Sequence, residues 1–371
     1  MSYEIDFVSV KKDICSKNAD AIAIRWNAGT DNNPDYHIGV VDGGYAEHGE
    51  ALRDHMNEYY FDDSDNIKNR DDKVIDFVLN THPDQDHIEG LKTVIKEFNV
   101  QALYMNRPWQ HLDELYDRVK DGRITKDSLE RRLREKFSYL DDLETTAYEC
   151  GVPIYDVFQG DKIADGFLIL SPSEGFYLDM LAASEKTPDM EVEEAKSLLE
   201  KFANKAKTVI ESWTDELLRE DVTTSPVNET SAILRGIVDG EGFLLTGDAG
   251  KQALTEAMDY LDNQGEDIKD TVSCYEMPHH GGRHNVTPSV LNRMIGNKVA
   301  KGVTTGKEAF ASVAQDCDHP KKMVVNAYLR RGVKVYKTRG IVLCHHCGNM
   351  PSRGWSTAPQ EDFSDEVEVW E

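Results

Sequence analysis

Short apolar runs of strand length, separated by polar turns, recur along the first part of the chain. These runs are rich in β-branched residues and alternate with polar positions, as in half-buried strands. They predict strands at 5–10, 21–26, 37–44, 74–82 and 99–105. Between the last two, residues 88–98 carry apolar side chains at helical spacing, which predicts one helix with a buried face.

The second half of the chain shows the same kinds of pattern. Residues 152–173 predict two strands joined by a turn, and 231–250 predicts a hairpin that ends in an acidic residue. Helices are predicted at 251–261 and at about 320–331. Two groups of strands with helices attached predict a mixed domain of packed α and β layers.

The charged segments interrupt this pattern without ending it. Residues 111–148 and 184–220 have helical spacing, and strand patterns resume after each, so we expect two helical insertions within a single domain at 1–348. The remaining residues, 349–371, form an acidic tail, either disordered or docked as a strand.

The composition of the chain bears on its cellular location and on the partners it can bind. The chain has 371 residues, 39% of them hydrophobic and 30% charged. No run approaches the about 18 apolar residues of a membrane span, and no signal-peptide pattern opens the chain, so we expect a cytoplasmic protein without a membrane partner. The net charge of −26 disfavours broad binding to duplex DNA, but it permits a nucleotide or strand end in a pocket that holds cations.

The six cysteines do not form a disulfide framework. They are scattered, and the single close pair is Cys344-His345-His346-Cys347. A structural zinc site needs about four ligands, usually from two such pairs, and the chain has no second pair. We therefore favour a strand end with reduced thiols, and the role of this pair stays open.

A dense group of potential metal ligands follows the predicted strand at 74–82. His82, Asp84, Asp86 and His87 lie within six positions, and a loop at a strand end can direct several such side chains into one cleft. Imidazole and carboxylate are ligands for zinc, manganese or iron. The alternative is a polar turn in which Asp84 or Asp86 caps the following helix.

Two further groups stand at strand ends. Asp248 follows the apolar run FLLTG, and His279-His280 follow SCYEMP. Each alone is a weak signal, but together with the first group they provide the ligands that a dinuclear hydrolase needs.

The order of the motifs resembles the metallo-β-lactamase superfamily. The matching segments are DGG (42–44), THPDQDHIEGL (81–91), NETSAIL (228–234), FLLTGD (243–248), PHHGG (278–282), HP (319–320) and YKTRG (336–340). The set looks closest to the hydrolase domain at the C-terminus of the competence protein ComEC and its stand-alone relatives. The resemblance implies an α+β fold, an αβ/βα four-layer sandwich of two mixed sheets flanked by helices.

The resemblance also implies roles for the residues. His82 and Asp84 would hold one metal ion, and Asp86 and His87 the other. Asp248 would bridge them, and His280, rather than His279, would complete the second site, since the pattern is Pro-x-His-Gly. Asp42 would orient a ligand histidine by a hydrogen bond. Asp86 and His87 would be the catalytic pair, with Asp86 orienting the attacking water.

Two departures from the superfamily pattern bear on the metal. Asp84 stands where a histidine is usual, and Asn228 stands where another histidine is expected. Both changes replace imidazole by oxygen, so for the two divalent ions manganese rivals zinc. His319 is ambiguous: it either reaches the cleft as a metal or substrate contact, or precedes a helix with Pro320 at the first helical position.

The leading hypothesis is a phosphodiesterase or nuclease that acts on single-stranded DNA or a nucleotide through metal-bound hydroxide. A second hypothesis is hydrolysis of a carbon ester, amide or lactam at the same site. A third is a metal-stabilised scaffold or binding subunit without catalysis, which would bind a protein partner through the acidic surface or tail.

Overall fold

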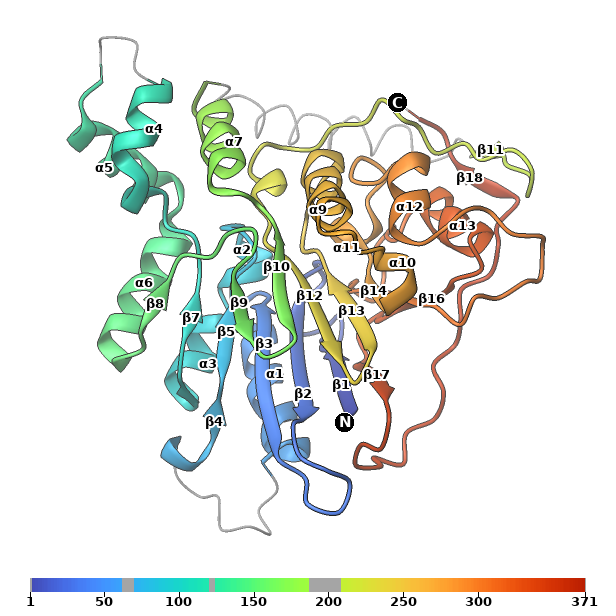
Figure 1. The fold of residues 1–371 in the computed structure, drawn as a ribbon, viewed down its shortest axis with the longest axis horizontal. Coiled ribbons are helices and arrows are strands. Elements are labelled where there is room, and N and C mark those ends of the chain that lie inside the picture. Colours follow the sequence, from blue (N-terminus) through green and yellow to red (C-terminus); the bar gives the residue numbers. More distant parts are fainter. Residues whose placement is uncertain (1, 62–69, 120–123, 187–207, 371) are drawn as a thin grey trace.

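Two seven-stranded sheets lie face to face, and each carries helices on its outer side (Figure 1). The computed structural model describes residues 2–61, 70–119, 124–186 and 208–370. Parallel and antiparallel neighbours occur in both sheets. Each sheet is therefore of the mixed type.

The first sheet comes mainly from the N-terminal half. Its strands, in spatial order, are β17 (Leu343–Cys347), β1 (Ser2–Phe7), β2 (Ala21–Asn27), β3 (Tyr36–Gly43), β5 (Phe77–Leu79), β7 (Leu103–Tyr104) and β8 (Ile154–Tyr155). Those from β3 to β8 run parallel to one another, and the residues of the central strand β5 are all buried. The helices on its outer face are α1 (Ala46–Tyr59), α3 (Leu91–Glu97) and α6 (Ser138–Cys150).

The second sheet comes mainly from the C-terminal half. Its strands, in spatial order, are β16 (Lys334–Lys337), β15 (Glu308–Ala311), β14 (Val272–Glu276), β13 (Glu241–Leu245), β12 (Ile233–Val238), β10 (Phe167–Ser171) and β9 (Lys162–Ala164). The helices that cover it are α9 (Lys251–Gln264), α12 (Pro288–Met294) and α13 (Lys322–Arg330). The predicted hairpin is present as β12 and β13.

Aromatic side chains fill the space between the sheets. Trp26 of the first sheet lies 4.7 Å, between ring centroids, from Phe167 of the second, and Phe7 stacks on Phe310 at 4.8 Å. These rings belong to one buried cluster that has members from both sheets. The order of layers is thus helices, sheet, sheet, helices, and the predicted fold class is confirmed.

The remaining elements lie in the connections. They are the strands β4 (Val74–Ile75), β6 (Asn99–Val100), β11 (Thr208–Ile210) and β18 (Glu366–Glu368), the helices α2 (Gln85–Ile88), α4 (Leu112–Val119), α5 (Lys126–Lys136), α7 (Glu174–Lys186), α10 (Ile268–Thr271) and α11 (Pro278–Gly281), and the 3-10 turns Arg70–Asp72, Pro108–His111 and Asn228–Thr230. No helix among the described residues is long and apolar enough to cross a membrane.

Several local predictions were wrong. The single helix expected at 88–98 is two helices, α2 and α3, and between them the N–H of Gly90 donates to the carbonyl oxygen of Gly44 instead of to a carbonyl of α2. The strand expected at 99–105 is the two short strands β6 and β7. The helix α1 and the strand β15 were not predicted.

The two predicted insertions differ in structure. Residues 111–148 contain α4, α5 and most of α6, and α6 packs on the first sheet. In the other insertion, 187–207 lie outside the described residues, and 208–220 contain β11 and no helix. The helical prediction is therefore wrong for 208–220.

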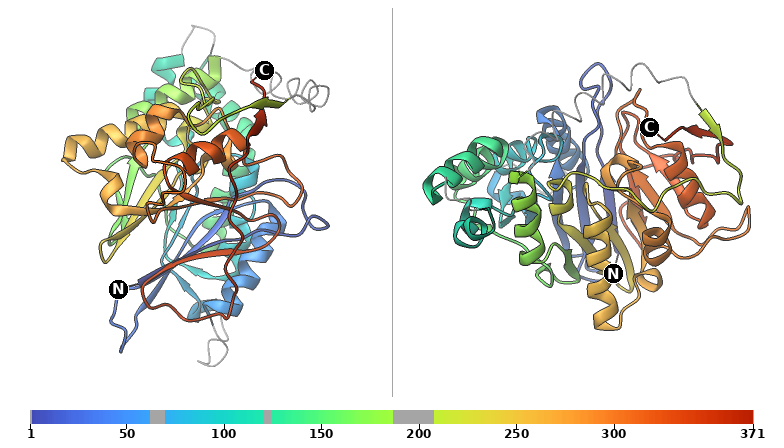
Figure 2. Two further views of the ribbon diagram at one scale, coloured as in Figure 1. Left: turned by 90° about the vertical axis from the view of Figure 1, so that its right-hand side faces the viewer. Right: turned by 90° about the horizontal axis from the view of Figure 1, so that it is seen from above.

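The C-terminal tail contributes an ordered strand. β18 pairs with β11 in an antiparallel ladder and buries Val367 (Figure 2). Trp370 donates its indole N–H to the carbonyl oxygen of Leu217, and Arg283 donates to that of Val369. The tail is thus attached to the residue that follows His279-His280-Gly281-Gly282.

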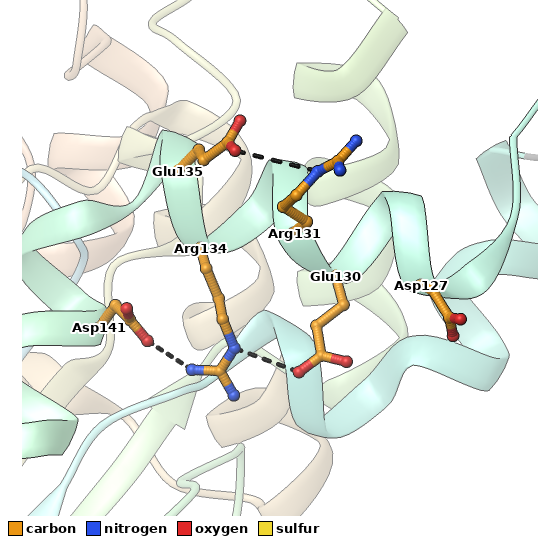
Figure 3. A pocket seen from close by; sticks show the side chains of 6 residues that line it. All are labelled: Asp127, Glu130, Arg131, Arg134, Glu135 and Asp141. Carbon is orange, nitrogen blue, oxygen red and sulfur yellow. Dashed lines mark hydrogen bonds and ion pairs between the residues drawn. The ribbon is translucent and has the colours of Figure 1, made fainter.

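A charged hollow lies over α5 and α6 (Figure 3). Arg134 lies between Glu130 and Asp141, and Arg131 pairs with Glu135. Its six lining residues include no histidine or cysteine. Exposed ion pairs of this kind contribute little to stability or to ligand binding, so the functional site has to be sought elsewhere.

Candidate metal centre

The potential ligands from both sheets converge where α2 and α11 meet, since the rings of His87 and His280 are 5.8 Å apart between centroids. The loop after β5 carries His82 and Asp84, and α2 carries His87. Asp248 follows β13 in the other sheet, and His280 lies in α11 after β14. Parallel strands end at the same edge of a sheet, so these loops meet across the interface between the two sheets.

One cluster joins four buried side chains. Ligand atoms of Asp20, His87, Asp248 and His280 all lie within 4.8 Å of one another. The Nε2 atom of His87 is 3.2 Å from Oδ1 of Asp248 and 3.8 Å from Oδ2 of Asp20. The Nδ1 atom of His280 is 3.3 Å from the same Asp20 oxygen.

A second cluster shares Asp248 with the first. The Nε2 atom of His82 is 3.5 Å from Oδ2 of Asp84 and 3.7 Å from Oδ2 of Asp248. Asp248 therefore presents one oxygen to each cluster. The Asp84 side chain is 44% exposed, so this second cluster opens to solvent on one side.

The state of the ligand atoms fits a bound cation. Among the buried side-chain atoms without a hydrogen-bond partner in the described residues, five belong to members of the two clusters: Asp20 Oδ2, His82 Nε2, His87 Nε2, Asp248 Oδ1 and His280 Nδ1. A buried polar atom without a partner is costly, and a divalent ion is the ligand that satisfies nitrogen and carboxylate oxygen together. The residues present therefore fit a metal ion.

Asp42 fixes the orientation of His87. It is buried at the end of β3 at a positive φ of 55°, and its Oδ2 accepts hydrogen bonds from Nδ1 of His87 at 2.7 Å and Oγ1 of Thr81 at 2.6 Å. A carboxylate next to Nδ1 requires the proton on that nitrogen, which leaves Nε2 free as a base directed into the first cluster. The contact is the one that the predicted orienting role of Asp42 requires.

Asp86 lies outside both clusters. Its Oδ2 is 3.4 Å from Nε2 of His280, and its side chain is 26% exposed. Asp84 stands at the N-cap of α2, yet its side chain makes no cap hydrogen bond. Helix capping thus does not account for Asp84.

Asp20 was not predicted as a site residue, because the predicted acids all follow strands. Asp20 precedes the first residue of β2. Because β2 runs antiparallel to β3, the start of β2 lies at the same edge as the end of β3. An acidic residue immediately before a predicted strand was the available signal.

The remaining predicted site residues surround Asp248. His279 hydrogen-bonds to Oδ2 of Asp248 through Nδ1, and Nδ2 of Asn228 is 3.0 Å from the same His279 nitrogen. The ring of His319 lies 6.5 Å from that of His279, between centroids, so His319 lies beside the centre. The helix-start interpretation of His319 is wrong, because α13 begins at Lys322, beyond Pro320.

The charges of the cluster shift the pKa values of its members. Burial raises the pKa of Asp20, and the neighbouring His280 and His87 only partly oppose this shift. Burial acts in the same direction on Asp248, but the adjacent His279 and His87 hold its pKa well below the usual range. For His87, burial lowers the pKa, yet Asp248 and Asp42 raise it well above its ordinary value. Imidazoles and carboxylates therefore stabilise each other's charged forms.

The pKa values of Asp86 and His319 are both lowered. Burial raises the pKa of Asp86, but the hydrogen bond from His280 and the charge on His87 lower it to about 2. Burial lowers the pKa of His319 to about 4, against the opposing hydrogen bond to Asp318. At neutral pH, Asp86 is thus an ionised carboxylate at the mouth of the centre, and His319 is neutral beside it.

The family model of the metallo-β-lactamase superfamily matches residues 33–169, which include the run from His82 to His87. No curated protein sequence matches the chain.

The chain is also similar to solved structures of low sequence identity. Unliganded yeast PDE1 is 11% identical with a TM-score of 0.43, and the match covers 91% of this chain and 97% of that one. The metallo-β-lactamase MIM-1 from Novosphingobium pentaromativorans is 11% identical with a TM-score of 0.30, covering 78% and 79% of the two chains. A β-lactamase domain protein from Burkholderia ambifaria is 14% identical with a TM-score of 0.31, covering 78% and 68%.

Proposed function

We propose that this chain is a hydrolase of phosphodiesters that uses two divalent ions, zinc or manganese, held in the two clusters. The observation that carries the proposal is the position of Asp248, which presents Oδ1 to His87 and Oδ2 to His82. A carboxylate shared between two groups of ligands is the arrangement of a dinuclear site. Two divalent metal ions bound in this way would supply a hydroxide nucleophile at neutral pH and offset the negative charge that develops on a phosphate.

The remaining protein groups would orient the metal ligands, the attacking water and the substrate. Asp42 holds His87 with its Nε2 toward the ions, and Thr81, which donates to the same Asp42 oxygen, keeps that carboxylate in place. Asp86 is ionised and half-buried, so it can orient an attacking water by accepting a hydrogen bond from it. The neutral His319, whose ring lies 6.5 Å from that of His279, would contact the substrate.

The ligand types support a phosphodiester over a carbon ester. Three of the six cluster residues are carboxylates: Asp20, Asp84 and Asp248. Oxygen ligands favour harder ions, and two such ions suit the in-line displacement at phosphorus. The net charge of −26 confines an anionic substrate to the immediate surroundings of the ions, so we propose a nucleotide or a single-stranded DNA end. The resemblance to the ComEC-like branch favours DNA.

The test compares the wild type with Asp248→Asn. Both are loaded with zinc or manganese and assayed on bis-para-nitrophenyl phosphate and on end-labelled single-stranded DNA. We expect Asp248→Asn to lower the rate at least about a hundredfold, since removal of even one charge-stabilising group costs about 10²–10³ in rate. The matched control is Asp76→Asn, because Asp76 pairs with His37 at the opposite end of β3 and should leave the rate unchanged.

A wild type no faster than Asp248→Asn on every phosphodiester would contradict the proposal. Hydrolysis of para-nitrophenyl acetate or of a β-lactam by the wild type, lost in Asp248→Asn, would assign the site to carbon esters or amides instead. Elemental analysis of the purified wild type provides an independent check, because a protein that retains no transition metal cannot use this chemistry.

A further inference from the structure

Asp20 is an acidic residue inside the centre that the superfamily motifs do not include. It lies in the turn before β2 and is 2% exposed. Its Oδ2 has no hydrogen-bond partner, although it lies 3.3 Å from Nδ1 of His280 and 3.8 Å from Nε2 of His87. A divalent cation between this oxygen and the two imidazoles would satisfy all three groups together.

The backbone around Asp20 is held from two sides. Its N–H donates to the carbonyl oxygen of Asp86 at 3.1 Å, which ties the turn to the metal-ligand loop. Two residues earlier, the side-chain oxygen of Asn18 accepts from the N–H of Ala314 at 2.9 Å, in the chain that follows β15 of the second sheet. The direction of the Asp20 side chain is therefore set by both halves of the fold.

The two nitrogens of His280 distinguish Asp20 from Asp86. Nδ1 is directed toward Asp20, which belongs to the same cluster as His280, whereas Nε2 is directed toward Asp86, which does not. These nitrogens lie on different edges of one ring. The carboxylate that shares an ion with His87 and Asp248 is thus the one that faces Nδ1.

We propose that Asp20, and not Asp86, is the carboxylate that holds the inner ion together with His87, Asp248 and His280. The proposal rests on the proposed two-ion function. It makes the two ion sites unequal: the inner one has four buried protein ligands, as closed structural sites have, and the outer one has His82, Asp84 and the shared Asp248. Asp86 then remains free at the mouth, where substrate and water arrive.

Unequal sites predict unequal retention of metal. The inner ion should survive dialysis against a moderate chelator, and the outer ion, with three ligands and an exposed Asp84, should be removed. Wild-type protein treated in this way should therefore keep one equivalent of metal and regain the second when metal is added back. Elemental analysis of the dialysed protein measures both states without any activity assay.

Four variants separate the candidate ligands. Asp20→Asn should lose the retained ion, with an affinity at least about a hundredfold weaker, since even outer groups that orient ligands change affinity by about 10–100-fold. Asp86→Asn and Asp84→Asn should both keep it. Asp20→Glu preserves a carboxylate and should partly restore binding. Circular dichroism of each metal-free form shows whether the fold is intact.

Retention of the ion by Asp20→Asn, or its loss in Asp86→Asn, would overturn the inference while leaving a metal-dependent hydrolase in place. Asp86 is more exposed than Asp20, so Asp86→Asn decides the matter even where Asp20→Asn fails to fold. A wild type that binds no metal at all would overturn the inference and the proposed function together. Loss in Asp20→Asn with retention in Asp86→Asn supports the assignment.

Discussion

Replacing Asp42 by asparagine changes one atom at the support of the metal centre. The Asp42 carboxylate accepts from the N–H and Oγ1 of Thr81 and from Nδ1 of His87, at 2.8, 2.6 and 2.7 Å. An asparagine has a single carbonyl oxygen, so its amide group faces at least one of these donors. If the amide faces His87, that ring must accept at Nδ1 and carry its proton on Nε2, where it cannot bind an ion.

The size of the effect follows from the bond that is lost. A hydrogen bond to a charged group contributes about 1.5–3 kcal/mol, and every 1.4 kcal/mol is about tenfold in affinity. We therefore expect Asp42→Asn to weaken zinc binding by about 10–100-fold, the range typical of groups that orient metal ligands. Competition with a chromophoric chelator measures the dissociation constant, and thermal unfolding of the metal-free proteins shows whether the fold is retained.

Asp76→Asn is the control for a lost carboxylate on the same pair of strands. Asp76 accepts from Nδ1 of His37 at 2.7 Å, the same distance as in the Asp42–His87 pair, but it lies at the other end of β3 and β5. The Asp76→Asn variant should bind zinc with the same affinity as the wild type. Equal zinc affinity for Asp42→Asn and the wild type would refute the claim that Asp42 sets the orientation of His87.

Two further predictions concern stability. Gly90→Ala should lower the free energy of unfolding by about 3 kcal/mol, because its Cβ would lie 2.0 Å from the Gly43 carbonyl oxygen. Gly175→Ala has open space around the added Cβ and should leave the free energy of unfolding unchanged. Denaturant titration of both variants tests this. Burial raises the pKa of Asp6, but the hydrogen bonds from His55 and Arg353 hold this pKa below its ordinary value of 3.8. The ionised Asp6 therefore stabilises the fold above pH 3.8, and this contribution is lost as the pH falls below 3.8. The difference in melting temperature between wild type and Asp6→Asn should therefore shrink on acidification, and a constant difference would contradict the ion pair.

Strands such as β2 and β5 could be predicted because their apolar residues form short runs bounded by polar turns. The helix α1 could not, since its buried face includes His48, Gly49 and His55 beside only two large apolar residues, Leu52 and Met56. Contact with other backbone, not hydrophobicity, selects Gly49: an added Cβ would lie 2.4 Å from the carbonyl oxygen of Gly90. A periodic pattern of apolar residues does not record such a contact.

The ligand loops were found because histidines and acids follow apolar runs in the sequence. Asp248 and the residues from His82 to His87 all obey this rule. Asp20 does not, because it becomes part of the centre through the antiparallel pairing of β2 with β3 and through the hydrogen bond from its N–H to Asp86. Which residues share an ion is decided by the direction of a ring such as His280, and that direction depends on tertiary packing.

The ligands of the inner site come from opposite sheets: Asp20 and His87 from the first, Asp248 and His280 from the second. An ion held there would act as a cross-link between the two halves, and neither half alone could capture it. Capture would then come after the halves have docked, so metal would leave the folding rate nearly unchanged and slow unfolding instead. The lifetime of the folded chain against proteases that cleave the opened form would thus depend on the metal supply around it.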